Sequence, residues 1–203
     1  MHPAALPDEE LLAQCGLGRG RASGPGGQHR NKVETAVTIA HRPTGVSAQA
    51  SERRSQIENK RVALRRLRLK LAIEIRTHPS PPATARRGKA PSAREGSPQR
   101  TSSAQNPDSP GPSPRSGPAS FPTDLWISRR HGAKIACNPA HHDYPALLAE
   151  ALDAIAAAHW DPAPAAKRLG VSTSQLIKLV KDHPPAFVKW NTERAALHAH
   201  VLR

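Results

Sequence analysis

The stretch from Arg21 to Lys32 reads Arg-Ala-Ser-Gly-Pro-Gly-Gly-Gln-His-Arg-Asn-Lys. Three glycines and a proline in four successive positions cannot continue a helix or a strand, because glycine reaches φ > 0 without steric cost and proline fixes its own φ. The stretch is therefore predicted to be a shaped loop whose backbone can approach another molecule closely. Basic residues on both sides of the loop indicate that this molecule is a nucleic acid.

Strand patterns surround the loop. Residues 15–21 alternate glycine with larger side chains, which permits an edge strand even though glycine weakens strands. Residues 36–41 are rich in β-branched side chains, residues 42–45 have turn chemistry, and residues 46–50 return as a further strand. Residues 31–35 are predicted to form a short helical turn. A small antiparallel sheet should therefore carry the loop.

A long helix is predicted after the sheet. Ser55-Gln56-Ile57-Glu58 has the pattern of a capping box, and the helix should run to about Arg76. Its apolar residues recur at helical spacing and are expected to pack on the sheet. They are Ile57, Leu64, Leu67, Leu71 and Ile75.

Five ordered motifs across roughly residues 19 to 76 resemble the catalytic domain of class I peptide chain release factors. They are Ser23-Gly24-Pro25-Gly26-Gly27-Gln28, Asn31-Lys32 with Thr35-Ala36-Val37, His41-Arg42-Pro43-Thr44-Gly45, Arg54-Ser55-Gln56, and Asn59. The resemblance implies hydrolysis of the ester that joins a nascent peptide to its transfer RNA, in the ribosomal peptidyl-transferase centre. The alternative is a glycine-rich hairpin loop without chemistry.

The resemblance also implies roles for individual residues. Gly26 and Gly27 would shape the loop, and the backbone N–H of Gln28 would interact with the 3′ oxygen of the leaving ribose while its side chain positions water. The remaining candidates are RNA-binding residues in the loop and on one helix face, where an ordinary solvated face is the alternative. They are Arg21, Ser23, Gly24, His29, Arg30, Asn31, Lys32, Arg54, Gln56, Arg61, Arg65 and Arg68.

Composition changes sharply in the second half of the chain. Residues 79–122 hold 11 of the 21 prolines and no Ile, Leu or Val, which predicts a disordered linker that is either a plain spacer or a loose RNA contact. We therefore predict three parts: a release-factor-like domain at 1–78, the linker at 79–122 and an all-α bundle at 123–203. The fold class is α+β.

Four helices are expected in the C-terminal module. The first should begin near Asp143, the second should cover 162–169, the third should follow a Ser172 cap, and the fourth should run after Pro184-Pro185. Trp126, Trp160 and Trp190 are expected to fill the space between them. Residues 165–176 resemble a helix-turn-helix that would expose Thr173, Gln175 and Lys178 to RNA or DNA. A plain helical corner is an equally good interpretation.

The composition of the chain favours a polyanionic partner. The 203 residues include 30 Lys and Arg against 16 Asp and Glu, a net charge of +14. Two distant cysteines do not suggest a disulfide framework, and no apolar run is long enough to span a membrane. Cys137, His141 and His142 lack a fourth ligand at suitable spacing, so neither a metal nor any other cofactor is expected.

These observations predict a function in translation. Only about 20 residues precede the loop, so the chain resembles the short, stand-alone release-factor-like hydrolases that rescue stalled ribosomes. We expect a cytoplasmic monomer that acts with large-subunit ribosomal RNA and peptidyl-tRNA, without a membrane partner and without reading a codon. The alternatives are a non-catalytic ribosome- or RNA-binding factor that uses the loop for docking, and a DNA-binding regulator built on the C-terminal helices.

Overall fold

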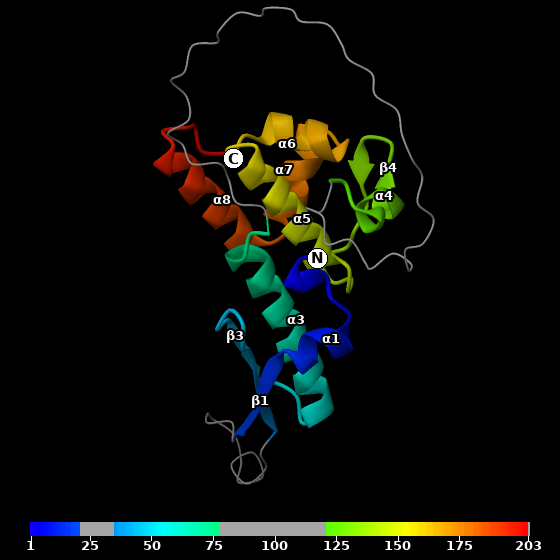
Figure 1. Cartoon of the computed structure of the whole chain (residues 1–203), viewed down its shortest axis with the longest axis vertical. Helices are drawn as coiled ribbons and strands as arrows, with labels where there is room; N and C mark the ends of the chain where they lie inside the picture. Colours follow the sequence, from blue (N-terminus) through cyan, green and yellow to red (C-terminus); the bar gives the residue numbers. More distant parts are fainter. Residues whose placement is uncertain (21–34, 78–120, 203) are drawn as a thin grey trace, which may run out of the picture.

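The computed structural model describes residues 1–20, 35–77 and 121–202. In this part of the chain a small sheet lies at one end, one long helix runs upward from it, and the C-terminal helices gather at the other end (Figure 1). The mixed α/β architecture confirms the predicted fold class in its coarse form. Among the described helices, none is both long and apolar enough to cross a membrane.

The sheet is antiparallel and has the order β1-β2-β3. Its strands are β1 (Cys15–Gly20), β2 (Ala36–His41) and β3 (Ser47–Ala50). The glycine-rich β1 is an edge strand, as its sequence predicts, and it pairs with β2 from Cys15 opposite His41 to Gly20 opposite Ala36. The inward side chains of β2 and β3, such as Ile39 and Ala48, are buried.

Helix α3 (Gln56–Glu74) covers the sheet by packing on β2 and β3. Leu64, Leu67 and Leu71 are buried as predicted. The prediction for Ile57 is wrong: its side chain is 67% exposed. Ile57 lies in the first turn of α3 beside Leu17, which is itself exposed on the edge strand, so the apolar stripe of the helix extends past the part that the sheet covers.

The ends of α3 also differ from the prediction. Ser55 occupies the N-cap position with extended backbone, but its side chain makes no capping hydrogen bond, so the expected capping box is not formed. The helix ends at Glu74, and Ile75 has extended backbone and is only partly buried. Before the sheet lie a 3-10 turn, η1 (Pro3–Ala5), and a short helix, α1 (Asp8–Ala13), which buries Leu11.

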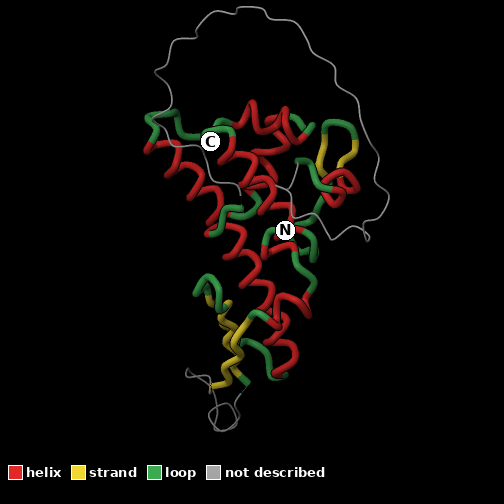
Figure 2. Tube along the Cα trace, viewed as in Figure 1, coloured by secondary structure: helices red, strands yellow, loops and turns green. Residues whose placement is uncertain are grey.

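The C-terminal part holds five helices and a two-stranded hairpin, distinguished by colour in Figure 2. Two features were not predicted from the sequence: α4 (Asp124–Arg129) and the hairpin of β4 (Arg130–His131) and β5 (Lys134–Ile135). These elements are too short to give a recognisable periodicity. The four longer helices lie where the sequence suggested: α5 (Tyr144–Ala157), α6 (Pro162–Leu169), α7 (Thr173–Lys181) and α8 (Pro184–Ala196).

Large aromatic side chains fill the interior of these helices. Trp126, Trp190 and Tyr144 are essentially inaccessible to solvent, and Trp160 is half-buried. The polar atoms of the three buried rings donate to backbone carbonyls, for example from Trp126 Nε1 to Leu169 O at 2.9 Å. Each of these three buried rings therefore has a hydrogen-bond acceptor for its polar group.

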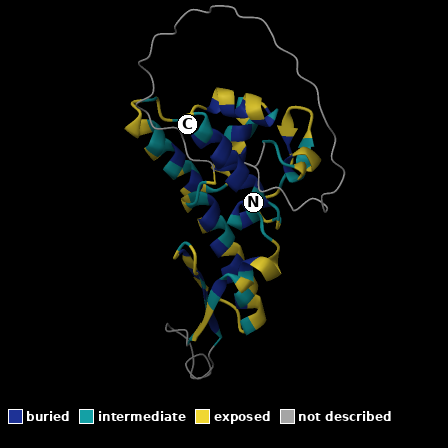
Figure 3. Ribbon diagram, viewed as in Figure 1, coloured by how far each residue is buried: buried dark blue, intermediate teal, exposed yellow. Residues whose placement is uncertain are grey.

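One hydrophobic cluster runs from the sheet through α3 into the C-terminal helices, as the burial colours show (Figure 3). Helix α5 packs against both α3 and η1, and α8 also touches α3. Polar groups join the two parts at the end of α3: Asp153 of α5 accepts hydrogen bonds from Thr77 and lies 3.8 Å from the guanidinium of Arg76. The division into 1–78, 79–122 and 123–203 stays a prediction, because residues 78–120 lie outside the described part.

Candidate functional site

The candidate catalytic triplet Gly26, Gly27 and Gln28 lies outside the described residues, but both ends of its loop are described. Gly20, the last residue of β1, pairs with Ala36, the first residue of β2. Residues 21–35 therefore begin and end at the same end of the sheet. The RNA-binding candidates of this segment likewise lie outside the described residues: Arg21, Ser23, Gly24, His29, Arg30, Asn31 and Lys32.

Asn59 fastens the returning end of the loop segment to α3. Its side-chain amide donates to the carbonyls of Thr35 at 2.7 Å and Arg53 at 2.8 Å, and its Oδ1 accepts from the N–H of Arg53 at 2.9 Å. The residue is completely buried. Its side chain thus holds the start of β2 and the approach to α3 in one arrangement.

Asn59 belongs to the sequence motifs, but its sequence context alone indicates no role for it. The available signal was chemical: asparagine is a poor residue for a helix interior, since its side chain competes for backbone hydrogen bonds. Only the structure shows that these bonds go to Thr35 and Arg53, 24 and 6 positions away.

A second polar residue, His41, fixes the other end of β2. Its Nδ1 lies 2.8 Å from Thr44 Oγ1 and its Nε2 lies 3.0 Å from Gln14 Oε1. Burial lowers the pKa of His41, which favours the neutral ring that accepts from the threonine hydroxyl and donates to the amide oxygen. Gly45 closes the predicted turn with φ of +73°. The His41–Gly45 motif therefore fixes the turn between β2 and β3 and joins it to Gln14 at the end of α1.

The sequence that forms these elements is similar to known proteins. Residues 15–109 match the RF-1 domain family. The match supports the class I release factor catalytic domain as the family of this segment, which we call the RF-1 domain. The match includes β1, the loop segment, the remaining strands and α3, which confirms the family suggested by the motifs.

Individual release factors are similar over the same region. The chloroplastic peptide chain release factor PrfB1 of Arabidopsis thaliana is 50% identical over 68 residues, which are 34% of this chain and 14% of that protein. The mitochondrial peptide chain release factor 1 of Homo sapiens is 49% identical over 55 residues, 27% of this chain and 12% of that protein. Peptide chain release factor 1 of Ureaplasma parvum is 59% identical over 51 residues, 25% of this chain and 14% of that protein. The chain thus spans about one seventh or less of these relatives.

The described RNA-binding candidates of the RF-1 domain do not form one uniform surface. Arg54 is exposed just before α3, and Gln56 is the first residue of that helix. Gln56 lines a small cleft of about 120 Å³ with Arg19 and Lys60, between β1 and the start of α3. These residues are placed near the anchored ends of the loop segment.

Two of the other candidates already have partners within the chain. The Arg65 guanidinium donates to the carbonyl of Pro139 at 2.7 Å. Arg68 donates to Ala4 O at 2.7 Å and pairs with the Asp8 carboxylate at 2.6 Å. With exposed Arg61, both arginines line a cleft of about 560 Å³ between η1, α3 and the start of α5. The structure therefore directs Arg65 and Arg68 toward the C-terminal helices and the N-terminal turn.

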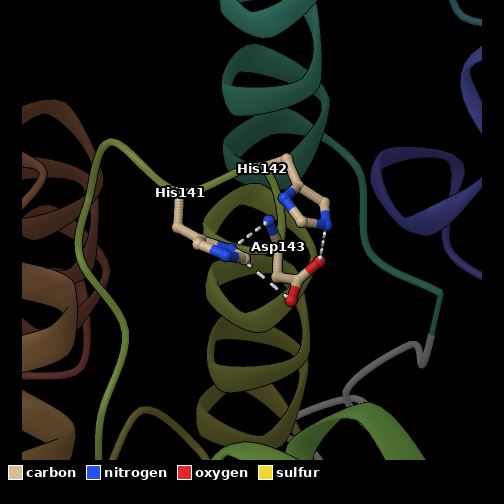
Figure 4. A group of neighbouring side chains, drawn as sticks. All are labelled: His141, His142 and Asp143. Atoms are coloured by element: carbon tan, nitrogen blue, oxygen red, sulfur yellow. Dashed lines mark hydrogen bonds and ion pairs between the residues drawn. The ribbon is translucent and has the colours of Figure 1, made fainter.

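His141, His142 and Asp143 gather at the start of α5, with their ligand atoms within 4.8 Å of one another (Figure 4). Arg129 donates to Asp143 Oδ2 from Nε at 3.0 Å and from Nη2 at 2.5 Å, and His142 Nε2 lies 2.8 Å from Asp143 Oδ1. The Arg129 guanidinium is therefore already paired with the Asp143 carboxylate, and this ion pair links α4 to the start of α5. We assign no metal to this group of residues.

Proposed function

We propose that this chain hydrolyses the ester bond of peptidyl-tRNA on the ribosome without reading a codon, in termination or in the rescue of stalled ribosomes. One observation carries the proposal: Gly26-Gly27-Gln28 lies inside the matched residues 15–109, between the paired strand ends Gly20 and Ala36. The proposed binding partners are large-subunit ribosomal RNA at the peptidyl-transferase centre and peptidyl-tRNA. We expect a cytoplasmic monomer.

In this reaction the protein has to position a water molecule and a hydrogen-bond donor at the ester. Water attacks the ester carbonyl carbon, the bond to the ribose 3′ oxygen breaks, and a proton passes to that oxygen. A backbone N–H at Gln28 would stabilise the charge that develops on the 3′ oxygen, and the Gln28 side chain would orient the water. Removal of one preorganised donor of this kind typically costs about 2.7–4 kcal/mol. The anchors at Asn59 and His41 would supply the rigidity that such placement requires.

Codon independence is the part of this proposal that concerns placement on the ribosome. The matched segments cover 12–14% of three release factors. The described residues beyond the RF-1 domain, 121–202, form a helical module that packs on α3. We propose that this module, and not recognition of a stop codon, places the RF-1 domain on the ribosome.

The test is peptide release from purified ribosomes that carry labelled peptidyl-tRNA in the P site. The A site would contain no messenger, a sense codon or a stop codon. Gln28→Ala is compared with Gln49→Ala, a matched control because Gln49 is an exposed residue of β3. We expect equal release from the three complexes, a loss on the order of a hundredfold to a thousandfold for Gln28→Ala, and no change for the control.

The outcomes separate the candidate functions. Strict dependence on a stop codon would overturn codon independence while leaving hydrolysis in place. Wild-type release by Gln28→Ala would overturn the catalytic role of the loop. Absence of release in every complex, with ribosome binding retained, would establish the non-catalytic docking factor instead.

A further inference from the structure

We infer that the C-terminal module carries its own RNA-binding surface, at the corner where the β4–β5 hairpin meets the turn between α6 and α7. We call this surface the basic corner and define it by six residues: Arg130, Lys134, Lys167, Arg168, Lys178 and Lys181. The partner is the phosphate backbone of double-helical RNA. This surface is separate from the loop of the RF-1 domain, and RNA binding by it does not require the activity proposed above.

The charge of the corner is one-sided. Residues 130–140 and 162–181 contain the six Lys and Arg residues of the corner and no Asp or Glu. Five of the six side chains are exposed and Arg130 is half-buried. Within the part of the chain that the structure describes, none of the six forms an ion pair. The corner therefore offers cationic groups that form no ion pair in the described part of the chain, although Asp161 and Asp182 border it.

Three of the module's seven acidic residues are engaged elsewhere, and Asp161 and Asp182 border the segment 162–181. Asp143 is paired with Arg129, Glu150 accepts from Thr123, and Asp153 faces Arg76 and Thr77. These contacts lie at the start of α5, beneath α4 and at the end of α3. The module is nearly balanced in composition, with ten basic and seven acidic residues from 123 to 203. In the fold, the six basic residues of the corner are separate from the three acidic residues named above.

The hairpin and the helical turn are fixed to each other. The N–H of Ser172 donates to Ala133 O at 2.9 Å, and Arg130 Nη1 donates to Gly170 O at 3.3 Å. Gly170 has φ of +67°, and a Cβ at this position would lie 1.9 Å from Arg130 Nη1. Because glycine occupies the turn, the arginine can lie directly on it. These two hydrogen bonds hold the hairpin against the α6–α7 turn, and the backbone of these elements lies together beside α4 and α7 in Figure 1.

The geometry favours backbone contact over the reading of bases. In a DNA-binding helix-turn-helix the first residues of the second helix contact base edges in the major groove. Here the hairpin contacts the first turn of α7 through Ala133 and Ser172. The exposed face of α7 is formed by Ser174, Lys178 and Lys181, two of which are long cations suited to phosphates.

Stacking on unpaired bases is also poorly supported at the corner. Of the six Phe, Trp and Tyr residues, Trp126, Tyr144 and Trp190 are buried in the interior, and Trp160 and Phe187 are partly buried and packed against the core. Phe121 is half-buried and lies under the guanidinium of Arg168, 5.8 Å from the ring centre. Helical RNA is recognised mostly through shape, phosphates and 2′-hydroxyls, and the RF-1 domain in the same chain associates this surface with the translation machinery. Double-helical RNA is therefore the partner that the observations favour.

The test measures binding of the full chain to a fluorescent RNA duplex and to a DNA duplex of the same sequence, at several salt concentrations. The variant Lys134→Gln/Lys178→Gln removes two charges from the corner. The control Lys70→Gln/Lys189→Gln removes two charges from α3 and α8, so both variants have the same net charge. Lys134, Lys178 and Lys70 are exposed, Lys189 is partly buried, and Lys70 donates to Ser47 O at 2.8 Å. Thermal unfolding therefore verifies that each variant is folded.

We expect the corner variant to bind duplex RNA on the order of tenfold to a hundredfold more weakly than wild type near 0.1 M salt. The slope of log K against log salt should fall by about two, the number of phosphate contacts removed. Equal affinities of the corner and control variants would overturn the proposal. A corner effect confined to the DNA duplex would also overturn it and identify a DNA-binding surface. Neither result depends on peptide release.

Discussion

The side-chain amide of Asn59 donates a 2.7 Å hydrogen bond to the carbonyl of Thr35, directly before β2 begins. The same side chain makes two hydrogen bonds to the backbone of Arg53. A buried residue of α3 therefore fixes both the returning end of the loop segment and the chain that leads into the helix.

Asn59→Ala should destabilise the protein and slow peptide release. It leaves two carbonyls and one N–H without their partner, and each such loss costs about 1–3 kcal/mol when the group is buried. Release should fall more than ribosome binding, because the anchored end of the loop segment is freed. The control is Asn191→Ala, which removes hydrogen bonds to Leu202 at the far end of the molecule. Equal release by the two variants would refute a positioning role for Asn59.

Leu67→Ala should cost far more stability than Ile57→Ala, although the sequence pattern placed both residues in the core. Leu67 is completely buried, and leucine-to-alanine changes in cores cost about 2–5 kcal/mol. Ile57 is 67% exposed, so its truncation should stay within about 0.5 kcal/mol. Urea unfolding of the two variants checks the difference. Similar losses would show that Ile57 is buried in solution.

Asp153→Ala should weaken the junction between α5 and the end of α3. The half-buried guanidinium of Arg76 would lose the carboxylate that lies 3.8 Å away, and Thr77 would lose its hydrogen bonds to this carboxylate. Removal of one partner from a buried charge pair costs about 3–5 kcal/mol. The control Asp124→Asn removes an exposed carboxylate in the first turn of α4 and should change stability little. Equal unfolding midpoints for these two variants would contradict the prediction.

Stability should decrease in mild acid. Burial lowers the pKa values of His2, His41 and His183 below 6.5 in the folded protein. The unfolded chain therefore binds protons more readily, so the free energy of unfolding is highest above about pH 6.5 and falls as pH drops through the folded pKa values. The loss per group approaches about 1.4 kcal/mol per pH unit.

Urea unfolding from pH 7.5 to 5.5 at constant ionic strength measures this effect. His41→Gln should reduce the pH dependence, whereas substitution of exposed His131 by glutamine should leave it unchanged. A free energy of unfolding that is constant over this range would contradict the prediction. Identical pH profiles for wild type and His41→Gln would show that His41 is not one of the responsible groups.

Local chemistry made much of the RF-1 domain predictable. The Arg42–Gly45 turn, the β-branched run before it and the leucines of α3 each carry a short-range signal, so the strands and the long helix lie close to their expected positions. Release-factor motifs then identified the family, which the match over residues 15–109 confirms. The catalytic and RNA-binding roles of Gly26, Gly27, Gln28 and the surrounding residues stay predictions.

Errors arose where the outcome depends on distant neighbours. Ile57 has the spacing of a core residue, but the sheet does not extend over it. Ser55 has the sequence of a cap, but its side chain makes no capping bond. RNA binding by the arginine stripe stays a prediction; the structure adds that Arg65 donates to Pro139 and Arg68 to Ala4 and Asp8.

By itself, the sequence determined the local elements and the family, because turn residues, side-chain periodicity and short motifs act over a few positions. Tertiary structure alone decided which groups meet across long separations: Asn59 with Thr35, Asp153 with Thr77, and Arg130 with Gly170. The physical reason is that hydrogen-bond satisfaction and charge segregation depend on which surfaces pack together, and no local pattern specifies that packing. The anchoring of the loop segment and the basic corner therefore became visible only in the folded chain.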